Sequence, residues 1–210
     1  MKPQRQFLRL LLATVGSVWL AGCLNLKPAR STTRHFVLAA TAVFPDGSGA
    51  PAAPCLAVGL GPVKVPGYLF RTSMAVRSGP TEVEYLDNAQ WAERIDTGCQ
   101  RVLAANLATL LPSDRIRRSA WRPQEVACEV QVAFDQFEVD TVGRGVLVAR
   151  WRITSAESAA LLKAGASRLT KPGPAPADNP EGAAATLSDL LADLSRELAD
   201  AVRTCVAGSK

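Results

Sequence analysis

Two segments of the chain carry hydrophobic residues at the spacing of an amphipathic helix. In both, the apolar positions recur at steps of three and four, which places them along one face. In the segment 91–111 they are Trp91, Ile95, Cys99, Val102, Leu103, Leu107 and Leu110. In the segment 186–205 they are Leu187, Leu190, Leu191, Leu194, Leu198, Val202 and Cys205. The pattern predicts two long helices, each with one buried face.

Side chains near the ends of these segments predict where the helices begin and stop. Asp87 or Asn88 can cap the first helix, and Pro112 ends it. Thr186 or Ser188 can cap the second helix, because a side-chain oxygen there accepts a hydrogen bond from a free backbone N–H group.

Alternation of apolar and polar residues predicts a β-hairpin. Residues 126–134 alternate, but the apolar residues of 137–139 fall on the opposite parity. A bulge at Asp135–Gln136 is therefore expected. Gly143 and Gly145 turn the chain, and residues 146–153 return as the second strand.

Shorter strand candidates precede the first helix, and together these elements define a fold class. The candidates lie at 35–42, 56–65, 74–76 and 82–85. Residues 159–170 fit neither pattern clearly, and the proline-rich residues 171–182 indicate a loop. Strands, helix, hairpin and helix in this order predict an α+β domain over residues 35–206. It has a mixed β-sheet of about four to six strands with two long helices packed on one face.

The N-terminus has the features of an export signal. Cations at Lys2, Arg5 and Arg9 precede an uncharged, mostly apolar run over residues 10–20. That run is too short to cross a bilayer, which needs about 20 apolar residues. Its length suits a signal peptide.

The end of this run matches the bacterial lipobox at all four positions. These are Leu20, Ala21, Gly22 and Cys23. Cleavage before Cys23 gives a signal peptide over 1–22 and a lipidated tether over 23–34. Acyl chains on Cys23 then anchor the protein to a membrane, and Leu24, where an Asp would retain a lipoprotein at the inner membrane, favours the outer one. A plain secretory signal with a chance cysteine is the alternative.

Composition suits a folded domain and removes nucleic acid as a partner. Of 210 residues, 48% are hydrophobic. The formal net charge of +5 includes the three cations of the signal peptide, which contains no acidic residue, so the mature chain carries +2. So small a net charge does not provide the basic surface that nucleic acid requires.

Four cysteines remain after lipidation, and they are disulfide candidates in an oxidising compartment. Cys55 and Cys128 each adjoin a predicted strand, while Cys99 and Cys205 lie on the apolar faces of the two helices. We expect the pairings Cys55–Cys128 and Cys99–Cys205. Buried free thiols are the alternative. The cysteines form no CxxC motif and have no His nearby in the sequence, so the sequence does not indicate a metal site.

The sequence carries no catalytic or cofactor motif. His35 is the only histidine, and Ser155, Ser158 and Ser195 lack both a G-x-S-x-G elbow and a paired His. No phosphate-binding loop is present, so the chain is not an ATPase. We therefore expect a protein that is not an enzyme, with no metal and no cofactor.

Residues 60–69, LGPVKVPGYL, form the most distinctive segment. They predict a strand that ends in a Pro-Gly turn with an aromatic residue just beyond it. Aromatic residues beside turns often anchor interfaces, which makes Pro62, Pro66 and Tyr68 candidates for contacting a partner. A purely structural role in shaping the turn is the alternative.

A second candidate for contacting a partner is the loop after the first predicted helix, where four arginines lie near Trp121 in the sequence. These are Arg115, Arg117, Arg118 and Arg122. Cations beside an indole, with Arg117 and Trp121 as the main candidates, suit anionic headgroups or an acidic partner surface. A solvated loop whose cations complement the helix dipole is the alternative.

Residues 60–69 resemble the LGPVxVPxYL segment of the ABC-type transport auxiliary lipoproteins, the family that includes PqiC. Trp91-Ala92-Glu93, the hairpin end Ala149-Arg150-Trp151 and the last helix follow in that family's order. Arg94-Ile95 stands where the family has Pro-Leu. On this resemblance Trp91 is a further candidate for partner contact.

The resemblance implies a lipid-anchored subunit of an MCE-type lipid transport system, facing the periplasm from the outer membrane. Its partners would be an MCE-domain protein and an ABC permease with its ATPase, and the domain would serve as a scaffold or docking element able to form a homo-oligomer. Two alternatives stay open. One is an accessory lipoprotein for assembly of lipopolysaccharide or an outer-membrane β-barrel, and the other is a tethered hydrolase.

Overall fold

The computed structural model describes residues 32–43, 57–111, 116–118 and 121–207. From Thr33 onward, these described residues form one compact unit. The signal peptide with Cys23, most of the tether, and also Cys55 and Arg115, lie outside the described residues.

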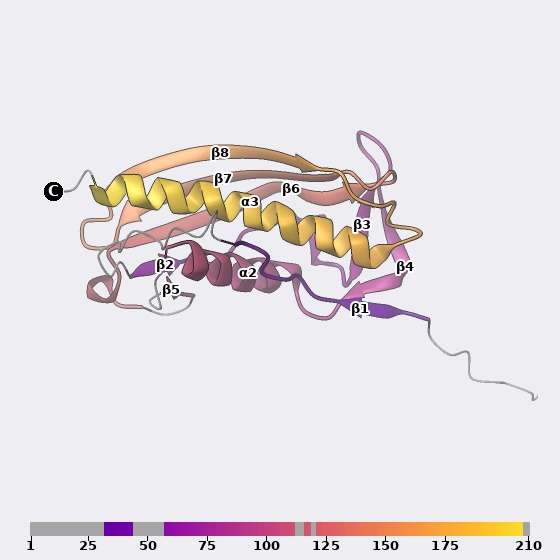
Figure 1. Ribbon diagram of the computed structural model, residues 1–210, viewed down its shortest axis with the longest axis horizontal. Helices are drawn as coiled ribbons and strands as arrows, with labels where there is room; N and C mark the ends of the chain where they lie inside the picture. Colours follow the sequence, from indigo (N-terminus) through magenta and orange to yellow (C-terminus); the bar gives the residue numbers. More distant parts are fainter. Residues whose placement is uncertain (1–31, 44–56, 112–115, 119–120, 208–210) are drawn as a thin grey trace, which may run out of the picture. The chain divides into compact units, whose positions relative to one another are not determined.

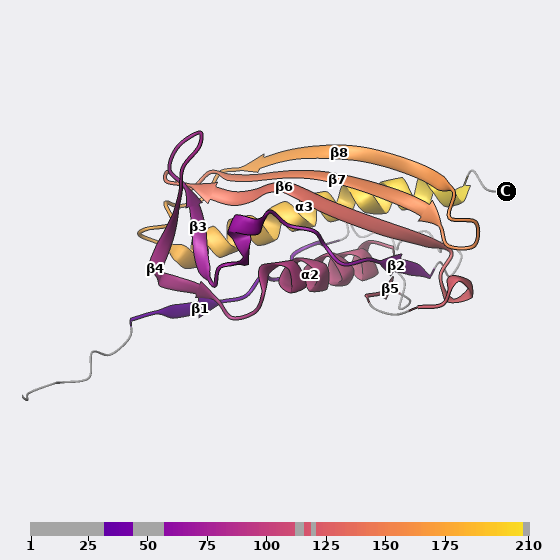
Figure 2. The same ribbon diagram turned by 180° about the vertical axis from the view of Figure 1, so that it is seen from behind.

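A mixed sheet of eight strands forms one layer of the domain (Figures 1 and 2). The strands are β1 (Arg34–Phe36), β2 (Val58–Leu60), β3 (Ser73–Arg77), β4 (Val83–Trp91), β5 (Ile116–Arg117), β6 (Cys128–Asp140), β7 (Gly145–Ser155) and β8 (Leu161–Lys171). Strands β6, β7 and β8 pair antiparallel in chain order. The other edge of β6 is shared by β2 and β3, which both run parallel to it.

Two helices form the second layer, and both lie on the same face of the sheet (Figure 1). They are α2 (Ile95–Leu110) and α3 (Pro180–Ala207). Two short 3-10 helices, η2 (Gly67–Phe70) and η3 (Pro123–Glu125), connect strands. Neither α2 nor α3 has the length and hydrophobicity needed to cross a membrane, as judged over the described residues.

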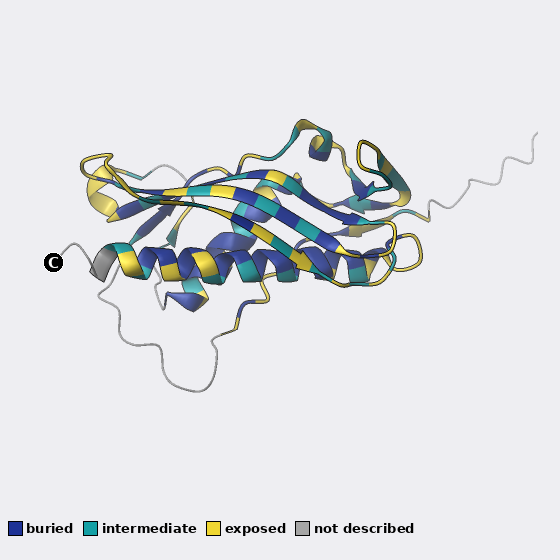
Figure 3. Cartoon of the chain, turned by 90° about the horizontal axis from the view of Figure 1, so that it is seen from above, coloured by how far each residue is buried: buried dark blue, intermediate teal, exposed yellow. Residues whose placement is uncertain are grey.

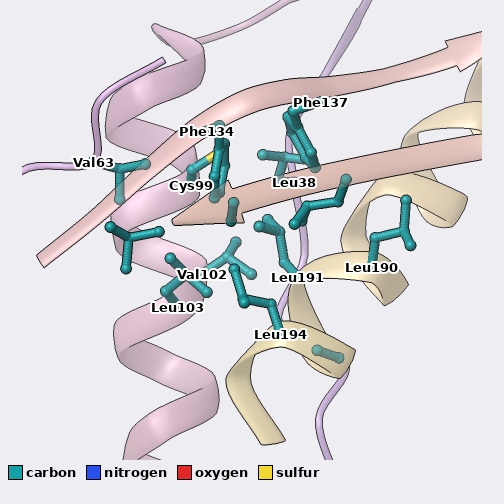
Figure 4. Packing of buried hydrophobic residues seen from close by; sticks show 14 of the residues in the cluster. Leu38, Val63, Cys99, Val102, Leu103, Phe134, Phe137, Leu190, Leu191 and Leu194 are labelled. Atoms are coloured by element: carbon teal, nitrogen blue, oxygen red, sulfur yellow. The ribbon is translucent and has the colours of Figure 1, made fainter. Parts of the chain in front are cut away.

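The core fills the space between the two layers. Leu103 of α2, Leu191 and Leu194 of α3, and Phe134 and Phe137 of β6 converge there, and each is at most 4% exposed (Figure 4). Leu and Phe side chains buried this completely contribute about 2 kcal/mol each through removal of apolar surface from water. The apolar faces predicted from the sequence thus meet one another and the sheet.

The α+β class, the two helices on one face and the hairpin are confirmed. The pairing of β6 with β7 shifts register between Phe134 and Gln136, which is the predicted bulge. Eight strands are present instead of four to six. Three of the eight are only two or three residues long, and most of residues 159–170, which fit neither pattern clearly, lie in β8.

The predicted start of each helix is wrong. Residues 83–91 continue as β4, so α2 begins only at Ile95, and no side chain caps it at Arg94. Helix α3 begins at Pro180, six residues before Thr186, and the side chain of Asn179 accepts a hydrogen bond from the Gly182 backbone N–H (2.9 Å). Proline is favoured in a first helical turn because it lacks the N–H group that would stay unpaired there.

Burial alternates along the strands in register with the two-residue repeat (Figure 3). In β6, Val130 and Val132 point toward the helices, and Glu129 and Gln131 point away. We call the side of the sheet that faces α2 and α3 the covered face, and the opposite side the outer face.

Candidate partner-binding surface

The distinctive segment 60–69 runs alongside β6. The Gly61 N–H donates to the Val130 carbonyl (3.0 Å), and the Lys64 N–H donates to the Val132 carbonyl (3.0 Å). Pro62 lies between them, is exposed, and has no N–H group to leave unpaired. Half-buried Pro66 then ends the extended stretch and stands directly before η2. The prolines therefore set the path of the backbone that carries the residues after them.

Helix η2 presents three side chains in three different environments. Leu69 is buried in the core, Tyr68 is half-buried, and Phe70 is 52% exposed. The Leu69 N–H donates to the Pro66 carbonyl (3.0 Å), which closes the turn. The turn thus fixes an aromatic residue at the surface by burying its neighbour.

Tyr68 belongs to a hydrogen-bonded network on the outer face. Its hydroxyl donates to the carboxylate of Glu138, which is only 1% exposed. That carboxylate also accepts hydrogen bonds from the guanidinium of Arg77 (Nε 2.8 Å) and the amide of Gln136 (2.9 Å). Burial, followed by the hydrogen bond to Glu138, raises the pKa of Tyr68 well above its ordinary value.

Three arginines stack on aromatic rings in this region. Arg94 lies 5.0 Å from the centre of the Phe70 ring, Arg71 4.5 Å from that of Tyr85, and Arg77 5.6 Å from that of Tyr68. The Tyr85 hydroxyl donates to the Tyr68 carbonyl (3.0 Å), which joins the pairs into one group. We call Tyr68, Phe70, Arg71, Arg77, Tyr85 and Arg94 the arginine–aromatic cluster.

The exposed members of this cluster are Phe70, Arg71 and Arg94. Arg94 is also held by the carboxylate of Asp96 (2.8 Å), so its side chain is fixed in front of the Phe70 ring. Such an arrangement costs little entropy to order on binding, because the side chains are already restrained. The sequence reasoning missed Phe70 and Arg94, although Phe70 directly follows the distinctive segment and Arg94 stands at the departure from the family's pattern.

The structure separates Trp91 from the other predicted contact residues. Trp91 is the last residue of β4 and is 8% exposed, and its side chain packs in the core. Its backbone N–H donates to the Thr72 carbonyl (2.7 Å). In this conformation a partner would not reach the Trp91 ring, and we interpret the residue as structural.

Trp121 and Arg117 lie at the other end of β6 from Tyr68. Arg117 is in β5 and is exposed. The Trp121 indole N–H donates to the Glu129 carboxylate (2.8 Å), and its ring covers Gly59, where an added Cβ would lie 2.6 Å from the ring. The predicted candidates therefore divide between two places on the molecule.

Neither predicted disulfide is present in the structure. Cys99 and Cys128 are free thiols, and Cys55 lies outside the described residues. Cys99 is fully buried in the core beside Phe134, and this burial raises its pKa well above the ordinary value (Figure 4). Cys205, near the end of α3, lies close enough to Cys128 for its charge to raise the pKa of that thiol, although burial is the larger cause.

A two-layer α+β domain with a pre-ordered arginine–aromatic surface has the features of a binding domain. In the described part of the chain, no three His, Cys, Asp or Glu side chains are grouped so that they could hold a metal ion. The family model for the ABC-type transport auxiliary lipoprotein component matches residues 36–199, so the chain belongs to that family. A search of the curated proteins found no match.

Solved structures share the fold at low sequence identity. A Xanthomonas campestris protein of the family DUF330 superposes with a TM-score of 0.66 at 11% identity, over 84% of this chain and 100% of that one. The crystal structure of an uncharacterized protein superposes with a TM-score of 0.67 at 16% identity, over 81% of this chain and 98% of that one. At these identities the likeness establishes the fold alone.

Proposed function

We propose that this chain is a non-enzymatic, lipid-anchored subunit of an MCE/ABC-type envelope lipid transport system. Anchored through Cys23 to the outer membrane and facing the periplasm, it acts as a docking element for an MCE-domain protein. Membership of the family described as the ABC-type transport auxiliary lipoprotein component carries the proposal.

The arginine–aromatic cluster supports the docking part of the proposal. Protein interfaces are enriched in aromatic residues and Arg. The few interface residues that contribute most of the binding energy are often Tyr, Trp or Arg. Phe70 is a large ring that remains 52% exposed, and the guanidinium of Arg94 stacks on it. A partner that covers Phe70 would remove this ring from water and gain both stacking and charge contacts.

The proposal is tested by affinity purification of the tagged full-length protein from detergent-solubilised membranes. We expect the wild type to recover an MCE-domain protein together with the permease and ATPase. The double variant Phe70→Ala/Arg94→Ala should recover at least tenfold less. Leu161→Ala is the matched control, because Leu161 is 63% exposed at the far end of the sheet, and it should recover wild-type amounts.

Two outcomes would overturn the proposal. Recovery of a β-barrel or lipopolysaccharide-assembly protein in place of the MCE-domain protein would favour the assembly-accessory alternative. A Cys23→Ser variant that matures and sediments with membranes as the wild type does would remove the lipid anchor from the account.

A further inference from the structure

The outer face of the sheet carries a hollow of about 1080 Å³ that the docking role does not use. It lies over β6, β7 and β8 and is bordered by the segment that follows β2. The register places Lys64, Ala133, Arg150 and Ala166 in one row across four chain segments. The next row contains Gln131, Arg152 and Ala164.

The floor of this hollow is formed by small apolar side chains. Ala133, Ala164 and Ala166 project only methyl groups into it, and exposed Pro62 stands at its border. Strands β6 and β7 are each paired on both sides, so their backbone groups are already hydrogen-bonded. An incoming peptide could therefore pair with backbone groups only at the edge of β8 that faces away from β7, whereas a hydrocarbon chain lying across β6 and β7 needs no such partner.

One wall of the hollow is the indole of Trp121. Its N–H donates to Glu129, the one carboxylate among the described lining residues, and its ring rests on the backbone at Gly59. Any side chain at position 59 would occupy the place of the ring, so the glycine is required for this packing. The wall is thus built from two independent contacts and presents an aromatic surface to the hollow.

The remaining charges in the hollow are cations, and two of them have no carboxylate partner. Arg150 is bound by the Asp135 carboxylate (2.7 Å). Arg152 is held by the neutral amide oxygen of Gln131 (2.9 and 2.6 Å), which orients its guanidinium without neutralising it. Among the described residues no carboxylate lies within ion-pairing distance of Arg152 or Lys64.

We propose that this hollow binds an amphipathic anion. Its hydrocarbon part lies on the alanine floor and against the ring of Trp121, and its acidic head group binds Arg152 and Lys64. The two cations stem from segments on either side of β6, about 12 Å apart at their backbones for two strand spacings and two residues along the strand. Both side chains are long enough to converge on one head group, which Arg can bind through paired N–H donors.

The binding is tested with the full-length mature lipoprotein held in a nonionic amphipol and titrated with dodecyl phosphate in a calorimeter. We expect saturable binding of one molecule. Inorganic phosphate, which has the charge alone, and dodecyl maltoside, which has the chain alone, should each bind at least tenfold more weakly. Chain-brominated dodecanoate should quench tryptophan fluorescence in the wild type, and Trp121→Phe should remove most of that quenching.

Variants assign the binding to this hollow. Lys64→Gln and Arg152→Gln should each weaken binding of dodecyl phosphate several-fold, and the double variant should weaken it at least tenfold. Lys64→Arg/Arg152→Lys should restore most of it. Arg168→Gln is the matched control, since Arg168 is an exposed outer-face cation outside the hollow, and it should bind within twofold of wild type.

Three results would overturn the proposal. Equal binding of dodecyl maltoside would show a groove selective for apolar chains only, and equal binding of inorganic phosphate would show a simple anion site. If the folded double variant Lys64→Gln/Arg152→Gln bound dodecyl phosphate as tightly as the wild type, the binding site would lie elsewhere. The hollow and the arginine–aromatic cluster use different residues, so loss of amphiphile binding and loss of MCE-protein recovery are separable failures.

Discussion

The two faces of the same sheet are built by different rules. On the covered face, Val130, Val132 and Phe137 pack against two helices and are at most 3% exposed. On the outer face, Glu138 and Gln131 each hold an arginine by hydrogen bonds, and Trp121 rests on a glycine. The covered face uses non-directional apolar burial, and the outer face uses directional polar contacts. Our two proposals assign recognition to the polar contacts, and stability to the apolar burial of the covered face.

Truncation of a core side chain should produce the largest effect on stability. Leu103 is 0% exposed between α2 and the sheet, so Leu103→Ala should lower the free energy of unfolding by about 3 kcal/mol through lost burial and a residual cavity. Gln131→Ala on the outer face should change it by less than about 0.5 kcal/mol. Urea denaturation measures both, and similar losses in the two variants would contradict the division between the faces.

Glu138 lies on the outer face, but its substitution should lower the free energy of unfolding almost as much as that of a core residue. Its carboxylate is 1% exposed and accepts hydrogen bonds from Arg77, Tyr68 and Gln136, so Glu138→Ala would leave these donors without their acceptor. We expect a loss of about 2–3 kcal/mol in unfolding free energy. Glu138→Gln, which keeps the shape, should lose less. A near-neutral Glu138→Ala would show that the network does not order this end of the sheet.

Adding a methyl group beneath Trp121 should displace the indole. Gly59→Ala would place a Cβ about 2.6 Å from the ring, closer than packed atoms approach. We expect a loss of about 1–2 kcal/mol and a red shift of the Trp121 fluorescence as the ring moves into water. Gly67→Ala is the control, because its Cβ would meet no atom within 4 Å. If Gly59→Ala left the fluorescence spectrum unchanged, this would contradict the packing of the Trp121 ring on Gly59.

The smallest expected effect is the change in stability with pH that comes from the ionisation of Tyr68. Burial and Glu138 raise the pKa of Tyr68 in the folded protein above the unfolded value of about 10. Protonated Tyr68 therefore adds stability that is fully present below pH 10 and is lost as the pH rises above it. In the folded protein, the absorbance change at 295 nm that disappears in Tyr68→Phe should occur at a higher pH than the ionisation of an exposed tyrosine. Ionisation of Tyr68 near pH 10 in the folded protein would contradict the network.

The covered face could be predicted from the sequence, whereas on the outer face the sequence indicated single residues such as Tyr68 and Trp121 but not their contacts. The apolar repeats at Leu103 and Leu194 and the alternation around Val130 are local patterns, and burial follows directly from them. The cluster depends on contacts between distant residues, such as Arg94 with Phe70 and Arg77 with Glu138, which no local pattern encodes. The sequence puts Trp91 on the apolar face of the first helix and, through the family resemblance, among the candidates for partner contact. The residue instead ends β4 and packs in the core.

Capping residues were misjudged for a related reason. Asp87 and Asn88 have the chemistry of helix caps, but the pairing of β4 with β3 and β1 holds this segment in an extended conformation. Tertiary pairing therefore overrides the local preference. Pro180 indicated a loop by composition and instead opens α3, a position where proline is well tolerated.

The central claim is that the arginine–aromatic cluster docks an MCE-domain protein, and photo-crosslinking in living cells tests it most directly. A photoreactive amino acid replaces Phe70 in one strain and Leu161, exposed at the opposite end of the sheet, in another. The account predicts a crosslink to an MCE-domain protein from position 70 and none from position 161. No such crosslink from position 70, or equal crosslinks from both positions, would contradict it.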